Sequence, residues 1–535
     1  MKKMKKRLAS LLAFCLLPCF ALAEGAGEWT ADVPQIPDTD VGNDIVFYEI
    51  FTPSFSDSDG DGVGDLQGVV NRLDYLNDGD PASGRSLGID GIWLTPVFLS
   101  PSYHKYDVKD YMTIDPAFGD MEDLSALIEG CHRRNIRLIL DLPINHTGYD
   151  HAWFQAFAEA HRTGDTASPY YDFYVWARDG EQPKDRTFCA LSGTDIVYEA
   201  NFSPSMPELD FENPDVREAV LQIAEYYLAL GVDGFRFDAA KYVYLNDGPS
   251  SVDFWNWYTG KIREIREDAY LVAEVWDNDA AVKPYDPYVN CFAFQGAQSE
   301  GWIAKAAKAG NVNRFTAAVA ERLTAIREAR PDGQLALFIA NHDMDRAAGY
   351  LTESAGQIQM AANLYLLSPG SPFIYYGEEI GLKGSRGAAN SDANRRLAMR
   401  WGDGDGVMDP AETTYDMQNQ TKNTVYDQIR SEGSLYSYYK RLLLLRRAHP
   451  EIAHGSYEPL SLPDTKAGGF VCALEGRETL VLHNTSKKAV QISLSDLGLA
   501  RFDAISASIG LGEARFADGT VTLDAQTTVL FTIEH

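Results

Sequence analysis

The sequence predicts an α/β protein: a (β/α)8 TIM barrel with a small domain inserted after strand 3 and a C-terminal antiparallel β domain. Three observations support this prediction. Eight short apolar segments alternate with helical stretches from about residue 44. The interval between the third and fourth segments is much longer than the others. After about residue 454 the helical pattern gives way to short alternating strands.

The barrel strands are predicted from near-continuous apolar runs, which are typical of parallel strands buried on both faces. They are 45–51, 89–96, 136–142, 232–238, 270–275, 291–294, 335–340 and 372–376. The helices between them are recognised by their ends. Asn213 and Pro214 begin one helix that Gly231 ends, and Asp120 caps another.

The long interval predicts the inserted domain. Asp141 and Asp238 are separated by about three times the roughly 30 residues of an average barrel repeat. The extra residues are rich in aromatic side chains, and they could wall one side of a cleft. We expect the barrel at 44–145 and 207–453, the inserted domain at 146–206, and a C-terminal β-sandwich at 454–535.

The first 23 residues read as a signal peptide. A basic start is followed by the apolar run 8–22 and by the small-residue cleavage pattern 21–23. Export to the periplasm or the medium is therefore expected. Lipid attachment at Cys19 is a less favoured alternative, because proline precedes that cysteine. No later segment has the roughly 18 consecutive apolar residues of a membrane span.

Charge limits the choice of partners. The net charge is −30 at pH 7, and removal of the basic signal peptide makes it more negative. Such a surface repels nucleic acid and anionic lipid, whereas a neutral sugar polymer meets no electrostatic barrier. We expect a monomer.

The four cysteines beyond the signal peptide include no CxxC pair, so neither a zinc nor a redox site is indicated. Their spacing indicates no disulfide. Cys131 falls in a predicted helix, where it reads as a small buried apolar residue.

Polar residues end several of the apolar strands, and the active site of such a barrel lies at those ends. Arg236 and Asp238 are two residues apart, so they project on the same side of their strand, and the arginine favours the ionised aspartate. Glu274 comes one strand later, and repulsion between neighbouring carboxylates favours a protonated Glu274. With Asp343 as a third carboxylate, the set suits glycoside hydrolysis with retention, which needs two carboxyls about 5–5.5 Å apart.

These segments resemble the sequence regions of the α-amylase superfamily, glycoside hydrolase family 13. The four main regions are DLPINH (141–146), GFRFDAAKY (234–242), AEVW (273–276) and FIANHD (338–343). Three auxiliary regions are GIDGIWLTPVF (88–98), MPELD (206–210) and SPFIYYGEEIGL (371–382). They occur in the family's order and span most of residues 44–400.

The resemblance implies catalytic and substrate-binding roles. Asp238 matches the nucleophile, Glu274 the acid/base and Asp343 the stabiliser of the transition state. The substrate-binding matches are Arg236, which fixes the nucleophile, His146 and His342, which bond sugar hydroxyls, Tyr106, a platform under the sugar, and Lys241 on the leaving-group side.

A calcium site is predicted in an acidic loop after the first strand. Its candidate ligands alternate along the chain: Asp57, Asp59, Asp61, Val63 and Asp65. Calcium prefers several oxygen ligands, and relatives bind it in this loop, with Val63 matching a carbonyl ligand. The start resembles an EF-hand, but Gly68 stands where the closing glutamate should be. A solvated acidic turn is the alternative.

A second calcium of many relatives is not predicted, because it uses Asn145 and a histidine where this chain has Tyr242.

For activity, we expect an α-amylase that cleaves α-1,4 bonds of starch and maltooligosaccharides through a covalent glucosyl-enzyme intermediate. MPELD lies between the patterns of α-amylases and of oligosaccharide-acting relatives, so an α-glucosidase or a 4-α-glucanotransferase is the alternative. A non-catalytic carbohydrate-binding relative ranks lower, because such proteins usually lose a carboxylate that this chain keeps.

Overall fold

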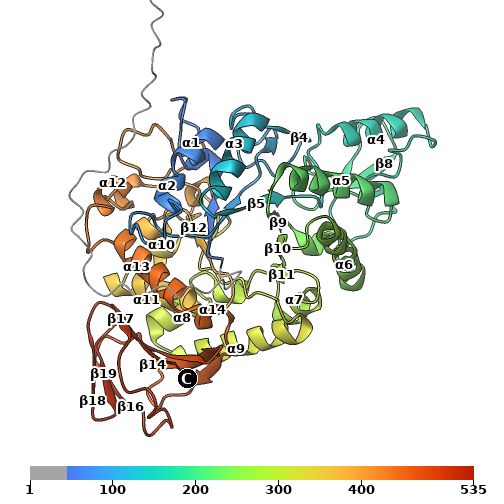
Figure 1. Ribbon diagram of the computed structural model, residues 1–535. Coiled ribbons are helices and arrows are strands. Elements are labelled where there is room, and N and C mark those ends of the chain that lie inside the picture. Colours follow the sequence, from blue (N-terminus) through green and yellow to red (C-terminus); the bar gives the residue numbers. More distant parts are fainter. Residues whose placement is uncertain (1–44, 535) are drawn as a thin grey trace, which may run out of the picture. The chain divides into compact units, whose positions relative to one another are not determined.

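The computed structural model describes residues 45–534 (Figure 1). The predicted signal peptide and the candidate lipid-attachment cysteine therefore lie outside the described residues. Within 45–534, no helix combines the length and the apolar character that a membrane crossing requires.

A seven-stranded parallel sheet forms the centre of the fold. The strands are, in spatial order, β11 (Asn290–Cys291), β10 (Tyr270–Ala273), β9 (Gly234–Phe237), β5 (Arg137–Leu142), β2 (Gly91–Leu94), β1 (Phe47–Ile50) and β12 (Phe373–Tyr375). Each lies within one of the predicted apolar segments, apart from a one-residue extension of β11.

The eighth predicted strand, 335–340, joins the two edges of this sheet through isolated bridges. Ala336 pairs with Phe292 next to β11, and Phe338 pairs with Phe373 of β12. The backbone N–H of Phe373 donates to Leu337 O at 2.8 Å. A regular strand was expected here. Its edge partners span only two and three residues, which leaves too few positions for a continuous ladder.

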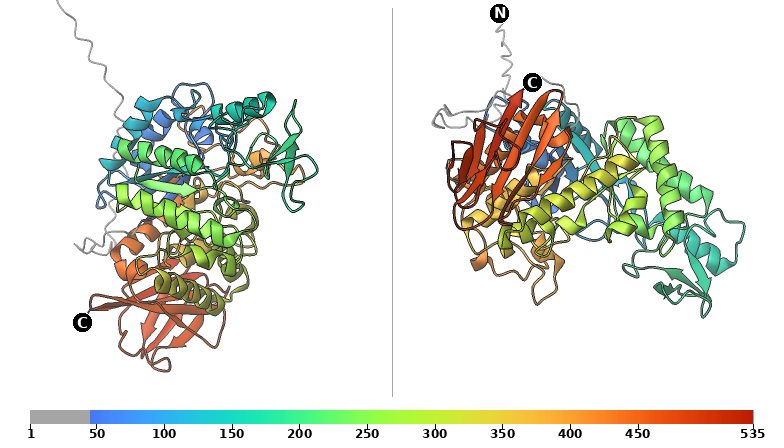
Figure 2. Two further views of the ribbon diagram at one scale, coloured as in Figure 1. Left: turned by 90° about the vertical axis from the view of Figure 1, so that its right-hand side faces the viewer. Right: turned by 90° about the horizontal axis from the view of Figure 1, so that it is seen from below.

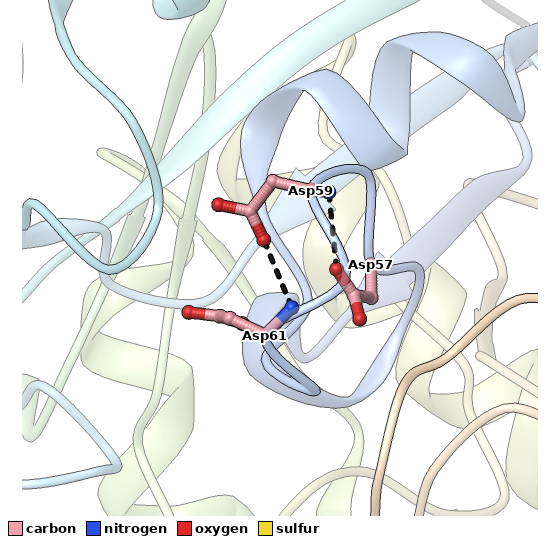
Figure 3. Close-up of side chains that lie close together, drawn as sticks. All are labelled: Asp57, Asp59 and Asp61. Atoms are coloured by element: carbon pink, nitrogen blue, oxygen red, sulfur yellow. Dashed lines mark hydrogen bonds between the residues drawn. The ribbon is translucent and has the colours of Figure 1, made fainter.

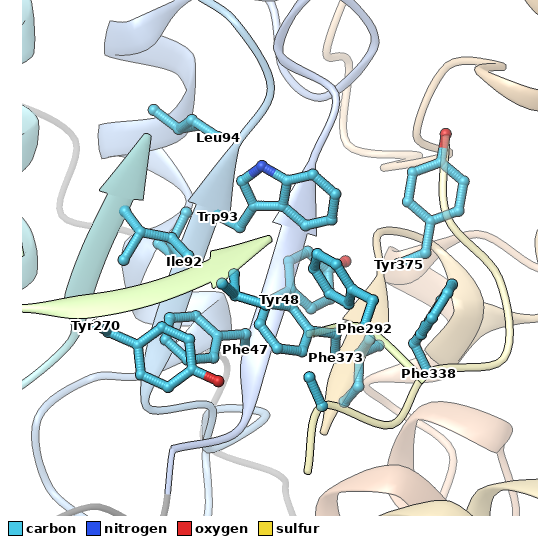
Figure 4. Close-up of a cluster of buried hydrophobic side chains, with 14 of the residues drawn as sticks. Phe47, Tyr48, Ile92, Trp93, Leu94, Tyr270, Phe292, Phe338, Phe373 and Tyr375 are labelled. Atoms are coloured by element: carbon cyan, nitrogen blue, oxygen red, sulfur yellow. The ribbon is translucent and has the colours of Figure 1, made fainter. Parts of the chain in front are cut away.

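Aromatic rings from opposite strands fill the interior of the barrel (Figure 4). The Phe47 ring lies 4.5 Å from Tyr270 and 4.7 Å from Phe373, measured between centroids. The Phe292 ring lies 4.8 Å from Phe373. The interior is therefore a packed core, as in other barrels of this architecture, and substrate chemistry is confined to the strand ends.

The predicted helix caps are present. Asp120 forms a capping box with Asp123 at the start of α3 (Met121–His132). Asn213 caps α5 (Pro214–Leu230), which ends at Gly231 in the left-handed conformation. The other helices of the parallel-sheet region are α1 (Leu66–Asn71), α2 (Leu73–Leu76), α6 (Gly248–Ile265), α7 (Asp279–Val282), α8 (Trp302–Ala309), α9 (Val312–Ala329), α10 (Ala347–Tyr350), α11 (Ala355–Leu366), α12 (Val425–Gln428), α13 (Leu435–Ala448) and α14 (Pro450–His454).

The long interval between β5 and β9 contains a helix and a small sheet, whose aromatic residues belong to the same apolar cluster as the barrel. It contains α4 (Ala152–Thr163) and an antiparallel sheet of β6 (Trp176–Arg178), β8 (Ile196–Glu199) and β7 (Phe188–Ala190). Its core is aromatic: the Phe154 ring lies 4.9 Å from Tyr198 and 5.0 Å from Tyr174. A separate hairpin, β3 (Phe98–Leu99) with β4 (Asp110–Ile114), precedes α3.

After α14 the chain forms two antiparallel sheets, coloured orange to red in Figure 2. The larger sheet consists of β13 (Glu458–Leu460), β14 (Ala467–Leu474), β15 (Arg477–Asn484), β20 (Thr527–Glu534) and β17 (Ala507–Gly510). The smaller sheet consists of β16 (Val490–Ser493), β19 (Thr520–Leu523) and β18 (Ala514–Ala517). Both contribute to one apolar core, in which Leu482 and Phe531 of the larger sheet join Val521 of the smaller.

The four cysteines of residues 45–534 pack against other side chains. Cys131, on α3, is buried, as are Cys291 and Cys472, and Cys189 is half-buried. All four are free thiols.

Candidate active site

Arg236 lies at the centre of the candidate site. One of its guanidinium nitrogens, Nη1, is 2.7 Å from Asp141 Oδ1 and 2.7 Å from Asp238 Oδ1. The other, Nη2, pairs with Glu274. These residues come from the ends of the neighbouring strands β5, β9 and β10, and the parallel register sets Asp141 directly opposite Arg236. The sheet therefore places the predicted nucleophile and the predicted acid/base in contact with the same guanidinium, that of Arg236.

Exposure separates the carboxylates into two kinds. The side chain of Asp141 is fully buried, whereas those of Asp238 and Glu274 are 12% and 15% exposed. Asp343 is the most open, at 34%. Asp141 can thus act only on its protein neighbours, while the other three face solvent in part.

The backbone turns sharply after the predicted nucleophile. Ala239 adopts a left-handed conformation with φ of 48°, which is strained for a residue with a side chain. Its neighbour Ala240 donates its N–H to Glu274 O at 3.0 Å. This bond ties the exit of β9 to the exit of β10.

Asp343 is held between two cationic groups. His342 Nε2 is 3.1 Å from Asp343 Oδ2, and Arg396 Nη2 is 2.7 Å from Asp343 Oδ1. On its other side, His342 Nδ1 is 2.6 Å from Glu49 Oε1, at the end of β1.

Tyr106 connects the two halves of the site. Its hydroxyl donates to Asp141 Oδ2 at 2.8 Å and lies 2.7 Å from His342 Nε2. The Tyr106 ring also stacks on His342, with centroids 5.5 Å apart. The predicted platform residue is therefore fixed by Asp141 on one side and by His342 on the other.

The carboxyls of the site differ in proton affinity. Burial raises the pKa of Glu274 to about 7, with Asp238 and Asp343 adding to the rise and Arg236 opposing it. Burial would also raise the pKa of Asp343, but His342 and Arg396 hold it well below its usual value. Near neutral pH, Glu274 can carry a proton while Asp343 is ionised.

The pKa of Asp238 departs from what the sequence pattern predicts. Arg236 does contact this carboxyl and favours its ionised form, as predicted. Burial nevertheless raises the pKa of Asp238 above its usual value, and Asp141 and Asp343 add to that rise. A strand pattern cannot show the degree of burial or the approach of two further carboxylates, so the net direction was not predictable.

His342 carries a positive charge at neutral pH. Burial alone would lower its pKa, but Asp343 and Glu49 raise it to about 10. His146 behaves in the opposite way, because burial lowers its pKa to about 4 and leaves a neutral ring. His146 Nε2 lies 3.2 Å from Tyr106 O, which places this histidine beside the predicted platform.

Lys241 lies on the Glu274 side of the site. Its Nζ donates to Trp276 O at 2.8 Å and to Asp277 Oδ2 at 3.1 Å. The lysine thus bridges the loop that follows Asp238 to the loop that follows Glu274, and its place on the leaving-group side stays a prediction.

Sequence reasoning missed Glu49, Asp141 and Arg396 as parts of this site. Glu49 and Asp141 each interrupt an apolar strand with a charge, which is a usable indication of a functional position. Arg396 had no such indication, since it follows a short 3-10 helix (Asp392–Arg395) outside the regular repeats.

The acidic loop after β1 brings three of its five predicted ligands together (Figure 3). One carboxylate oxygen from each of Asp57, Asp59 and Asp61 lies within 4.8 Å of the others. Asp65 instead caps α1, accepting the N–H groups of Gly68 at 2.6 Å and Ser58 at 2.7 Å. The backbone N–H of Val63 donates to Asp61 Oδ1 at 2.7 Å. A set of hard oxygen donors of this kind fits a calcium ion.

At the position of the second calcium of some relatives, Asn145 donates its side-chain amide to Glu208. The Tyr242 ring packs on Phe202 with centroids 4.7 Å apart.

Known proteins resemble this chain over most of its length. The family model "Alpha amylase, catalytic domain" matches residues 49–455. Alpha-amylase 3 of Dictyoglomus thermophilum is 36% identical over 453 residues, which are 83% of this chain and 85% of that protein. A 4-alpha-glucanotransferase of Thermotoga neapolitana is 33% identical over 352 residues, 64% of this chain and 72% of that protein.

Two solved structures agree with this result. Eubacterium rectale Amy13B superimposes with a TM-score of 0.85 at 32% identity, covering 94% of this chain and 97% of that chain. The alpha-amylase from H. orenii superimposes with a TM-score of 0.80 at 34% identity, covering 92% and 99%. The predicted barrel with C-terminal antiparallel sheets is thereby confirmed. The chain is an enzyme of the α-amylase superfamily, glycoside hydrolase family 13.

Proposed function

We propose that the protein is a retaining α-amylase, which hydrolyses the α-1,4-glucosidic bonds of starch and maltooligosaccharides. The observation that supports this best is the cluster of Asp238, Glu274 and Asp343. All three are partly exposed at strand ends. Glu274, with a pKa of about 7, can supply the proton that a two-step displacement needs, and Asp343 is ionised beside it.

In the first step, Asp238 attacks the anomeric carbon of the bound glucosyl unit. Arg236 holds the attacking carboxylate and favours its ionised form. Glu274, with a pKa of about 7, gives its proton to the departing glycosidic oxygen. The sugar is then esterified to Asp238 with inverted configuration.

In the second step, the ionised Glu274 takes a proton from water, and the resulting hydroxide displaces Asp238 from the anomeric carbon. A second inversion restores the α configuration and returns the proton to Glu274. Asp343, ionised beside His342 and Arg396, can accept hydrogen bonds from sugar hydroxyls and stabilise the positive charge of the oxocarbenium-like transition state.

A 4-α-glucanotransferase is the second candidate. A relative with that name shares 33% identity over 352 residues, and the same three carboxylates would serve if a sugar hydroxyl replaced water in the second step. α-Glucosidase action on short chains stays within the same alternative, and an oligo-1,6-glucosidase of Parageobacillus thermoglucosidasius is 27% identical to this chain.

We also propose that the loop after β1 binds calcium. Asp57, Asp59 and Asp61 would supply direct carboxylate ligands and Val63 its carbonyl oxygen, following the alternate positions of an EF-hand-like loop. Asp65 stands at the position that often binds through water, which is compatible with its role as the α1 cap.

Product analysis over time decides between the activities. Starch, pullulan and maltotriose would be incubated with the enzyme, and the products separated by chain length. A ladder of maltodextrins from starch supports the α-amylase. Glucose alone indicates an exo-acting glucosidase, and products longer than maltotriose from maltotriose indicate a transferase.

A further inference from the structure

The segment inserted between β5 and β9 is tied to the loop that follows the nucleophile strand. Arg186 Nη2 donates to Leu245 O at 2.9 Å, and the neighbouring Asp185 accepts from Asn246 Nδ2 at 2.9 Å. Leu245 and Asn246 follow Asp238 by only a few residues. Two hydrogen bonds therefore join the insertion to the loop that follows Asp238.

Arg186 also neutralises a buried carboxylate. Its Nη1 is 3.1 Å from Glu199 Oε2, and the Glu199 side chain, at the end of β8, is only 3% exposed. Glu199 Oε1 accepts from Asn201 Nδ2 at 2.7 Å. A buried carboxylate needs a partner charge or hydrogen bonds, and Arg186 supplies the charge.

The hydrogen bonds continue from Glu199 to the exit of β5. The backbone and side-chain amides of Asn201 both donate to Glu208 Oε1 at 3.2 Å. The other oxygen of Glu208 accepts from Asn145, the residue before His146. The backbone of Asn145 is fixed as well, because Leu209 N donates to Asn145 O at 3.0 Å.

We propose that Arg186 is a positioning residue for the reaction proposed above: it locks the inserted segment onto the loop after Asp238 and, through Glu199, Asn201 and Glu208, sets the position of His146. Arg186 is suited to this because its planar fork reaches Leu245 O and Glu199 at once, which the single ammonium of a lysine cannot reproduce. The inference rests on the proposed function, since His146 matters here as a sugar-binding residue.

Loss of Arg186 leaves Glu199 buried without its cation and removes one of the two hydrogen bonds that join the insertion to the loop after Asp238. A displacement of roughly 1 Å at a substrate-positioning residue can cost about 100-fold in rate. We therefore expect Arg186→Gln to lower kcat/KM on maltotriose by about tenfold or more. Amide hydrogen exchange should become faster over residues 186–201.

A matched control is available in the same segment. Arg178, on β6, pairs with Asp195 across side chains that are 63% and 78% exposed. Exposed pairs contribute little, so Arg178→Gln should stay within about twofold of the unchanged enzyme. A similar loss in both variants would mean that the insertion tolerates no arginine change, and it would overturn the specific role of Arg186.

The decisive experiment is a double-mutant cycle that combines Arg186→Gln with His146→Ala, with kcat and KM measured on maltotriose. If Arg186 acts through His146, its replacement costs much less once His146 is absent. Additive losses, or an Arg186→Gln enzyme with unchanged kcat/KM, would overturn the proposal. Should Arg186→Gln fail to fold, Arg186→Lys replaces it in the cycle and is read by the same criteria.

Failure of the proposed function is a separate result. In that case the enzyme without any substitution would release no sugar from any α-glucan. Comparing amide exchange of this enzyme with that of Arg186→Gln would still show whether Arg186 stabilises the insertion.

Discussion

Two groups of three carboxylates on this chain differ in their exposure to solvent. Asp141, Asp238 and Glu274 surround the buried Arg236, whereas Asp57, Asp59 and Asp61 lie on an open loop. The first group cannot keep three like charges together without a cation or a bound proton. The second group is stabilised by water and by backbone N–H donors. The same residue type is therefore set up for reaction in one place and for ion binding in the other.

The proton affinities reflect this difference. Burial raises the pKa of Glu274 to about 7. At Asp57 burial is the largest single influence and also acts upward, but hydrogen bonds from the backbone of Gly60, Gly62 and Asp59 together lower the pKa below its usual value. Removing a member of the buried group should thus affect chemistry, and removing a member of the exposed group should affect only metal affinity and stability.

The largest expected effect comes from Asp238→Asn. The amide is nearly isosteric but cannot attack the anomeric carbon, so reducing-sugar release from starch should fall on the order of 10⁴-fold or more. The melting temperature should stay close to that of the unchanged enzyme. Cleavage at an undiminished rate would show that Asp238 is not the nucleophile, and that the buried group is not the reactive one.

The second largest effect is expected when Glu274 loses its proton or is replaced. Because the general acid must be protonated, kcat/KM should fall as the pH rises through about 7. Glu274→Gln should lower kcat on starch by about 10²–10⁴-fold and abolish this alkaline limb. On an aryl maltoside whose leaving group needs no proton, the loss in the first step should be much smaller. Equal losses on both substrates would contradict an acid role.

Arg396 allows a finer test at Asp343. His342 and Arg396 together hold the pKa of Asp343 well below its usual value. Arg396→Gln removes one of these cations, so the pKa of Asp343 should rise, which a titration of this carboxyl followed by NMR would detect. Arg386→Gln provides the control, because Arg386 pairs with Asp392 and its side chain is 41% exposed. An Asp343 pKa that is the same in all three enzymes would show that Arg396 does not set the ionisation of Asp343.

The smallest effect is expected at the open loop. Stripping calcium with a chelator should lower the melting temperature by roughly 1 °C for each kcal/mol that bound metal contributes to stability. The doubly substituted Asp59→Asn, Asp61→Asn protein should melt lower without chelator and respond to it no further. Metal analysis that finds no calcium in the purified protein, with no change in melting, would leave the loop as a solvated acidic turn.

Much of the buried group was predictable from sequence. All strands of a parallel barrel end on the same side, so charged residues that end apolar strands lie together at the carboxyl end of the barrel. The adjacency of Asp238 and Glu274 then follows from the pairing of β9 with β10. Arg396 could not be found this way, because it reaches Asp343 from an irregular stretch of chain. The bridging segment 335–340 depends equally on tertiary packing that no local pattern shows.

The most direct measurement is to trap the intermediate. A fluorinated glucosyl fluoride that forms the ester quickly and releases it slowly would be incubated with the enzyme, which would then be digested and analysed by mass spectrometry. The mechanism predicts one sugar per chain, esterified to Asp238, with no label in the Asp238→Asn protein. A sugar attached to any other residue, or an unlabelled enzyme whose initial products have the β configuration, would contradict it.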